Sequence, residues 1–203
     1  GGSKPLDGAS FYARLGQKII HLLTTSMGSG LLYEVDMRLR PSGASGLLVT
    51  SLDGFALYQR EQAWTWEHQA LVRARVVVGD SVLAARFDTV RADVLAQPRE
   101  LSALRQEVRE MRQKMRDHLA PKDPSEIDLK HSPGGLVDIE FLVQFLTLAY
   151  APAHPALTQW PDNVRLLDTL AQSGLLPTAD AEALKSAYLA LRRAGHARAL
   201  AGA

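Results

Sequence analysis

Charged side chains gather on one side of a short alternating segment near the start of the sequence, between positions 31 and 39. On that side lie Glu34, Asp36, Arg38 and, just beyond, Arg40. Because side chains alternate between the two faces of a strand, the pattern predicts a β-strand with one apolar and one charged face. A carboxylate there can ligate Mg²⁺ and guanidinium groups can bind phosphate oxygens, as phosphoryl transfer requires. The alternative is a solvent-facing strand with ordinary ion pairs.

A second group of charged and small residues lies in the second half of the sequence. Lys130 precedes Gly134 and Gly135, which stand where an apolar helix is expected to begin. Open backbone N–H groups at a helix start can bind an anion, and Lys130 would lie close to it. The alternative is a tight entry loop in which Asp138 caps or pairs locally. Asp138 and Glu140 are two positions apart and would not share a helix face, so they are not interpreted as a metal-binding pair.

Aromatic and basic residues are interleaved a little after the charged strand. Trp64 and Trp66 precede His68, and Arg73 and Arg75 follow. Such residues can stack on a base or clamp a phosphate, but tryptophans at this spacing more often pack in a core. His68 has no second ligand at a suitable spacing, so we interpret it as a structural histidine.

Arginines recur every three or four positions along a later segment and would share one face of a helix. These residues are Arg105, Arg109, Arg112 and Arg116. Acidic residues nearby favour the interpretation that this face is solvated. The alternative is that the arginines form a docking surface for an acidic partner.

Gly43 and Gly46 likewise have two interpretations, a hairpin loop or a loop that approaches phosphate. The hairpin is favoured because no phosphate-loop motif is present.

The secondary-structure elements that must position these residues are predicted from the spacing of apolar residues and from the glycines and prolines that interrupt it. Besides the strand at 31–39, a second short strand is expected at 47–49 and an extended piece at 127–129. Helices are expected over 11–25, from Ser51, over 81–95, after Pro98, over 136–150, from Pro161 to Gly174 and from Thr178. The predicted fold class is α+β, mainly α, with a domain boundary near Gln97 that separates residues 1–97 from residues 98–203.

Composition excludes several classes of protein. With 203 residues the chain can bury a full core, and its net charge of +1 indicates neither a nucleic-acid nor a membrane-surface partner. The absence of cysteine excludes disulfides and thiolate chemistry. No apolar stretch approaches the roughly 20 residues that cross a bilayer. Residues 1–3, Gly-Gly-Ser, look like a tag remnant. We expect a soluble, cytoplasmic protein.

Three blocks of sequence resemble the glutamine synthetase adenylyltransferases. The first is LYEVDMRLRPSG at 32–43, and the second is AWTWEHQAL at 63–71, followed by Arg73 and Arg75. The third begins with Asp-Leu-Lys at 128–130 and continues with GGLVDIEF at 134–141. The similarity runs from about Phe11 to the C-terminus, with the blocks in the family's order.

The resemblance implies a truncated nucleotidyltransferase domain, with a short β-sheet and helices, followed by a helical bundle. Family members transfer AMP from ATP to a tyrosine of glutamine synthetase and remove it again, under control of the PII signal protein and glutamine. The tryptophan-rich block resembles the adenylylating half. By this resemblance Asp36 is the third metal-binding carboxylate, catalytic with Mg²⁺, while Arg38, Arg40 and Lys130 are nucleotide contacts.

The sequence departs from the family pattern in one respect. The Asp-x-Asp pair that supplies the other two metal ligands does not occur before Asp36. We therefore expect this chain alone to be inactive. Two alternatives stay open: a helical docking module for glutamine synthetase or PII, and the related PII uridylyltransferase, against which the block at 64–71 argues.

Overall fold

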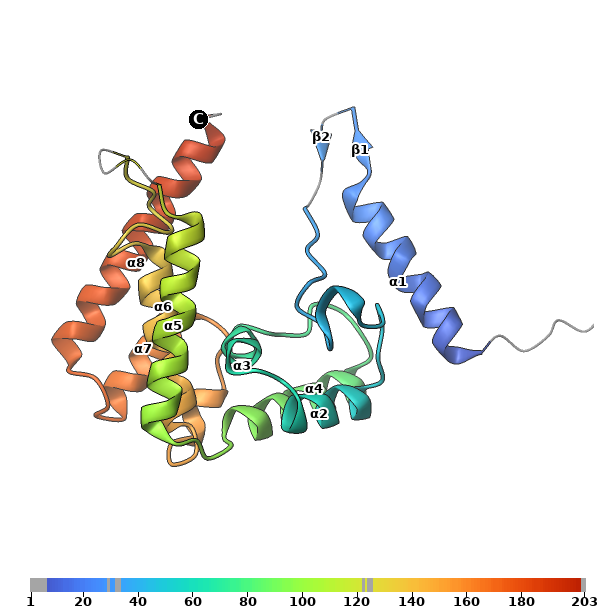
Figure 1. Ribbon diagram of the computed structural model, residues 1–203, viewed down its shortest axis with the longest axis horizontal. Coiled ribbons are helices and arrows are strands. Elements are labelled where there is room, and N and C mark those ends of the chain that lie inside the picture. The colour runs from blue at the N-terminus through green and yellow to red at the C-terminus, as the bar shows by residue number, and fades with distance from the viewer. Residues whose placement is uncertain (1–6, 29, 32–33, 122, 124–125, 202–203) are drawn as a thin grey trace, which may run out of the picture. The chain divides into compact units, whose positions relative to one another are not determined.

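The computed structural model describes residues 7–28, 30, 31, 34–121, 123 and 126–201 (Figure 1). The chain forms two compact units, Gly1–Ala63 and Trp64–Ala203. The predicted fold class is confirmed: the protein is mainly helical, with one small antiparallel sheet among the described residues. No helix in the described ranges is both long and apolar enough to cross a membrane.

The first unit consists of short elements with little core. Helix α1 (Gly8–Thr24) leads into strands β1 (Ser26–Met27) and β2 (Gly30–Leu31), which pair antiparallel. A 3₁₀ turn, η1 (Gly43–Ser45), and helix α2 (Leu52–Glu61) follow. No residue of α1 is fully buried, and its apolar side chains are exposed or only partly buried.

The predicted strands of the first unit are wrong for the residues described. Residues 34–38 have no regular secondary structure, and Leu39 and Arg40 lie in a bend. Residues 32 and 33 lie outside the described residues. Positions 47–49 are also not a strand, and neither are positions 127–129 of the second unit. A strand requires backbone partners, and among the described residues the ladder ends after two residue pairs, at Ser26 with Leu31.

The second unit is a bundle of helices joined by short connections. Its elements are α3 (Thr65–Val72), α4 (Ser81–Leu95), α5 (Leu101–Leu119), α6 (Leu136–Tyr150), the 3₁₀ turn η2 (Pro155–Thr158), α7 (Asn163–Gln172) and α8 (Thr178–Leu200). The predicted bounds of α4 and α6 are confirmed. Since α3 packs against α4, α5 and α6, the compact unit begins at Trp64 and includes the residues on both sides of Gln97.

Two predicted helix starts need correction. The helix expected from Pro161 begins at Asn163, because the Asp162 carboxylate accepts the Arg165 N–H and caps it. Thr178 is the first residue of α8 rather than its cap, and the capping position is occupied by Pro177. Gly174 does end α7, with the positive φ of 69° that favours glycine after a helix.

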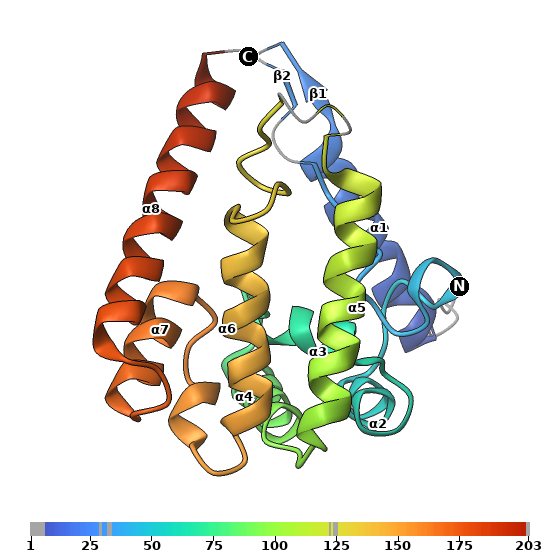
Figure 2. The ribbon, with the colours of Figure 1, turned by 60° about the vertical axis from the view of Figure 1, so that its left-hand side comes forward.

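Helix α6 lies at the centre of this unit. It packs against α3, α5, α7 and α8, and Figure 2 shows it between α5 and α8. Val143 and Leu148 of α6 are fully buried, as are Leu166, Leu167 and Leu170 of α7. A helix that is apolar around most of its circumference must be covered on several sides, so α6 dictates where its neighbours lie.

A buried guanidinium connects the other side of the unit. Arg91 of α4 is 5% exposed and donates to backbone carbonyl oxygens at the end of α3 and around η2. Its acceptors are Leu71 O at 3.0 Å, Val72 O at 2.5 Å, Thr158 O at 2.5 Å and Trp160 O at 3.3 Å. Burial lowers the pKa of Arg91, and the charge of Asp88 partly offsets this. The guanidinium thus joins three segments that are distant in sequence.

We predict that Arg91→Met lowers the free energy of unfolding by about 3 kcal/mol, because buried carbonyl groups lose their donor. Urea unfolding at neutral pH measures this loss. The matched control is Arg193→Met, at an exposed position of α8, for which a change within about 0.5 kcal/mol is expected. Equal effects of the two substitutions would contradict a structural role for the Arg91 bonds.

Candidate functional site

The carboxylate predicted as a metal ligand is exposed and closely paired in the first unit. Arg38 donates to Asp36 from its backbone N–H at 2.8 Å, from Nε at 2.9 and 3.0 Å, and from Nη2 at 2.6 Å. The side-chain hydrogen bond and then the backbone hydrogen bond from Arg38 lower the pKa of Asp36 to about 2. Asp36 is therefore an anion throughout the neutral range, with a guanidinium at its side.

Arg40, predicted as a phosphate contact, instead binds the loop that follows it. Its guanidinium donates to Met37 O at 2.5 Å, Ala44 O at 3.1 Å and Gly46 O at 3.4 Å. Gly46 is required by close packing, because an added Cβ would lie 1.9 Å from Pro41 O. The glycines here serve a tight turn.

The Asp36 region fits a metal ion only in part. Asp36 is exposed and offers two carboxylate oxygens, the ligand type that Mg²⁺ prefers. Among the described residues, however, no group of three or more acidic or histidine side chains is arranged to hold a metal ion. Asp36 can thus act as one ligand of a site whose other ligands come from other groups.

The start of α6 does not offer open N–H groups to an anion, and that interpretation of the glycines is wrong. Gly135 N–H donates to Ser132 O, and the next two N–H groups donate to Leu129 O and Lys130 O. Asp138 accepts the Gly134 N–H at 2.7 Å, which confirms the local cap. A Cβ on Gly135 would lie 2.8 Å from Ser132 O, so this glycine allows the loop to fold onto the helix.

Lys130 nevertheless lines a groove of about 530 Å³ in the second unit, between the start of α6 and the later part of α8. Arg73 Nη1 bonds Glu140 Oε1 at 2.9 Å inside it, and the Tyr188 hydroxyl donates to the same oxygen at 3.4 Å. Arg192 lies 5.8 Å from the Tyr188 ring. Three cationic side chains and a single carboxylate leave this groove positive. We call it the Lys130 groove.

Tyr188 and Arg192 of the Lys130 groove were not identified from the sequence. They lie on α8, 48 positions or more after Glu140, and no local motif marks them. Lys130 belongs to the second compact unit and Asp36 to the first.

The tryptophan-rich block contributes polar contacts within the second unit. His68 is buried, and its Nδ1 lies 3.3 Å from Arg99 Nη2, which confirms a structural histidine. Gln69 Nε2 donates to Gln144 Oε1 of α6 at 3.0 Å. Trp64 is 70% exposed, so the expectation of core packing is wrong for this tryptophan.

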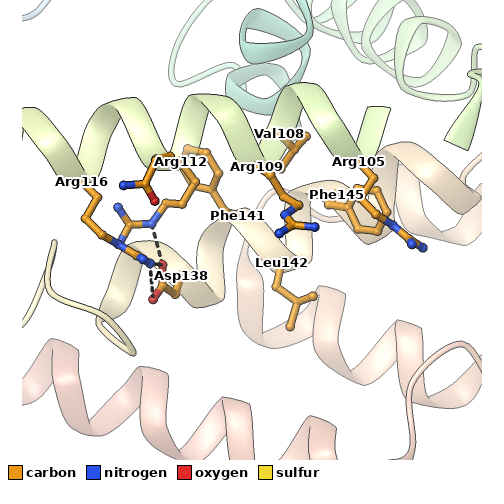
Figure 3. A pocket seen from close by; sticks show the side chains of 10 residues that line it. Arg105, Val108, Arg109, Arg112, Arg116, Asp138, Phe141, Leu142 and Phe145 are labelled. Carbon is orange, nitrogen blue, oxygen red and sulfur yellow. Dashed lines mark hydrogen bonds and ion pairs between the residues drawn. The ribbon is translucent and has the colours of Figure 1, made fainter. Parts of the chain in front are cut away.

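The arginine stripe is divided along α5. Arg112 is buried, and its Nε bonds Asp138 Oδ1 at 2.5 Å, while Arg116 Nη2 lies 3.3 Å from the same oxygen (Figure 3). The interpretation as a wholly solvated face is therefore wrong for these two. Burial raises the pKa of Asp138, but the Gly134 N–H and the two guanidinium groups outweigh burial and lower it overall.

Comparisons with known proteins identify relatives of the whole chain. The family model described as glutamate-ammonia ligase adenylyltransferase matches residues 1–90, and that of GlnD PII-uridylyltransferase matches residues 102–199. Bifunctional glutamine synthetase adenylyltransferase/adenylyl-removing enzymes of Pseudomonas putida and Pseudomonas syringae are 54% and 55% identical over 98% of this chain. The enzyme of Pseudomonas aeruginosa is 54% identical over the same share. The chain spans about a fifth of these relatives, 21% to 22% of their length.

We predict that Asp138→Asn destabilises the second unit by about 2 kcal/mol at neutral pH, because Arg112 loses its carboxylate partner. The folded-state pKa of Asp138 lies below its ordinary value of 3.8. Its stabilisation is therefore present above that value and is lost as the pH falls through the folded pKa. Urea unfolding across the acid range should give a flatter pH profile for the variant, and an unchanged profile would contradict this role.

Proposed function

Because this chain belongs to the glutamate-ammonia ligase adenylyltransferase family, we propose that it forms part of an enzyme that transfers AMP from ATP to a tyrosine of glutamine synthetase. The observation that carries the proposal is the identity of 54% to 55%, over 98% of the chain, to three enzymes with this name. Both compact units lie within that alignment. The activity is proposed for a protein of the relatives' length.

The adenylylating reaction is favoured over uridylyl transfer for the same reason. The uridylyltransferase model matches only residues 102–199, within the second unit. The adenylyltransferase relatives match the first unit as well, including the block around Asp36. We assign the chain to the adenylylating half because of its tryptophan-rich block at 63–71. As domains we propose residues 1–97 and 98–203, a division that follows the two family matches, which end at residue 90 and begin at residue 102, and that differs from the compact units divided at Trp64.

Asp36 is the proposed metal ligand. Its pKa of about 2 keeps the carboxylate ionised, and Mg²⁺ would bind its oxygens in place of the Arg38 side chain that now pairs with them. Mg²⁺ would supply the charge that neutralises the phosphate oxygens of ATP. Arg38 lies beside the carboxylate and can turn to a phosphate oxygen. Arg40 is the weaker phosphate contact, since its guanidinium already binds carbonyl groups of the loop.

Lys130 is the proposed nucleotide contact of the second unit. Its ammonium group, Arg73 and Arg192 line one positive groove, and only Glu140 offsets their charge there. The residue range that contains Lys130 and Arg192 also matches a family described by uridylyl transfer. A site that serves both adenylyl and uridylyl transfer recognises the phosphates, which the two nucleotides share, and not the bases, which differ. A groove lined by cationic side chains agrees with such a site.

The partners and surroundings follow from the same proposal. Glutamine synthetase is the protein substrate, ATP the nucleotide, Mg²⁺ the metal ion, and the PII signal protein a regulator, with the cytoplasm as the compartment. Asp36 is one of the three carboxylates that the family's metal site is expected to use, and one carboxylate is too few ligands for that site, so we propose that residues 1–203 alone do not transfer AMP.

We predict that Asp36→Asn, in a form extended to the length of the relatives, lowers the rate of AMP transfer at least about 100-fold, because a metal ligand loses its charge. Transfer of radiolabelled AMP to glutamine synthetase measures this rate. The matched control is Glu34→Gln, at an exposed neighbouring carboxylate, for which a near-normal rate is expected. An Asp36→Asn enzyme with normal transfer would refute the assignment.

We predict that Lys130→Met weakens ATP·Mg²⁺ binding by the extended form about tenfold, because one charge-assisted phosphate contact is lost. Titration calorimetry measures the change. Lys114→Met is the control, since Lys114 is exposed on α5 and lies outside the Lys130 groove. If both variants bind ATP as the unmodified protein does, the groove is not a nucleotide site.

A further inference from the structure

A second groove runs along α5 where this helix faces α6, and it has no part in the proposed transfer reaction. It has a volume of about 350 Å³. We call it the arginine groove. It is lined by Arg105, Val108, Arg109, Arg112, Gln113, Arg116, Asp138, Phe141, Leu142 and Phe145. Figure 3 shows the four arginines in a row along α5.

The charge of the arginine groove is unequally compensated along its length. At one end Asp138 pairs with Arg112 and Arg116. Toward the start of α5, Arg105 and Arg109 are exposed and have no hydrogen-bond or ion-pair partner among the described residues. The groove therefore has an excess of positive charge that is concentrated toward the start of α5.

The paired end also has unused donors. Arg112 Nη1 and Arg116 Nε are buried and have no hydrogen-bond acceptor in the part of the chain that the structure describes. The Arg112 side chain is only 9% exposed. A buried cationic N–H without an acceptor is costly, so this wall has more donor capacity than Asp138 satisfies.

The opposite wall of the arginine groove is apolar. It is formed by Phe141, Leu142 and Phe145 of α6. Leu142 is 37% exposed, and the two phenylalanines are partly buried. The groove thus has one cationic and one apolar wall, and a ligand that fills it must have both characters.

We propose that the arginine groove binds an extended acidic peptide segment of a partner protein, in which carboxylates alternate with apolar side chains. Alternate residues of an extended chain point to opposite sides and are about 6.6 Å apart. Arg105 and Arg109 are separated by about 6 Å along α5. Carboxylates two positions apart can therefore bind these arginines, while the residues between them contact the α6 wall.

The length of the arginine row favours a peptide over a single phosphate or carboxylate. From Arg105 to Arg116 the row extends about 16 Å along the helix axis. A small anion can occupy only one part of this row. An extended peptide of about five residues covers it, since each residue advances about 3.3 Å.

The experiment uses a fluorescein-labelled peptide of alternating glutamate and leucine, measured by fluorescence anisotropy with the chain of residues 1–203. Arg105→Glu combined with Arg109→Glu should weaken binding at least tenfold. The matched control combines Lys114→Glu with Arg193→Glu, which changes the net charge equally at exposed positions outside the groove. The control variant should bind the peptide with an affinity within about twofold of that of the unmodified chain.

Two further measurements examine the apolar wall and the fold. A peptide of alternating glutamate and serine, and the Leu142→Ser variant with the original peptide, should each bind several-fold more weakly. Thermal unfolding verifies that each variant remains folded, and the Leu142→Ser variant tests the groove without altering its charge. Because no ATP is present, the result does not depend on the proposed AMP transfer.

Three outcomes would overturn the proposal. The first is no binding of the glutamate–leucine peptide. The second is equal weakening by the groove variant and its charge-matched control, which would indicate attraction to overall charge. The third is displacement of the peptide by inorganic phosphate more effectively than by chloride at equal ionic strength, which would indicate a small-anion site.

Discussion

The burial of α6 is the constraint on which the second unit depends. Its apolar residues cover most of its circumference, so α3, α5, α7 and α8 must all pack against it. Its charged residues are confined to the first turns, where Asp138 and Glu140 point to different neighbours. Asp138 pairs with arginines of α5, and Glu140 pairs with Arg73 and Tyr188. Two carboxylates on one buried helix thus define two grooves.

The first unit lacks a comparable organising element among its described residues. Its helix α1 buries no residue, and its sheet consists of two strands of two residues each. Local hydrogen bonds therefore determine the geometry around Asp36. Arg38 fixes the carboxylate, and Arg40 fixes the following loop through backbone carbonyls. Residues that look equivalent in an alternating pattern have different roles, because one arginine meets a carboxylate and the other a turn.

The sequence predicts the helices well where periodicity and caps agree. Helices α4 and α6 have the expected bounds, since Asp80 caps α4 and the Gly134–Gly135 loop precedes α6. Prediction failed where the outcome depends on distant partners. The alternating segment around Asp36 is not a strand, because strand formation requires a neighbouring backbone that no local pattern reveals. The N–H groups at the start of α6 donate hydrogen bonds to the carbonyl oxygens of Leu129 and Lys130, and these contacts cannot be recognised from the sequence alone.

The same reasoning explains why composition conceals both grooves. A net charge of +1 averages over the chain, whereas binding depends on charges that remain uncompensated in one place. On α5 the acidic neighbours of the arginines are occupied elsewhere: Glu107 accepts a hydrogen bond from Thr65, and Glu110 accepts one from Gln106. Both stay negatively charged, but neither forms an ion pair with Arg105 or Arg109 among the described residues. Helix periodicity therefore separates cations from anions that are adjacent in sequence, and a nearly neutral chain presents two positive grooves.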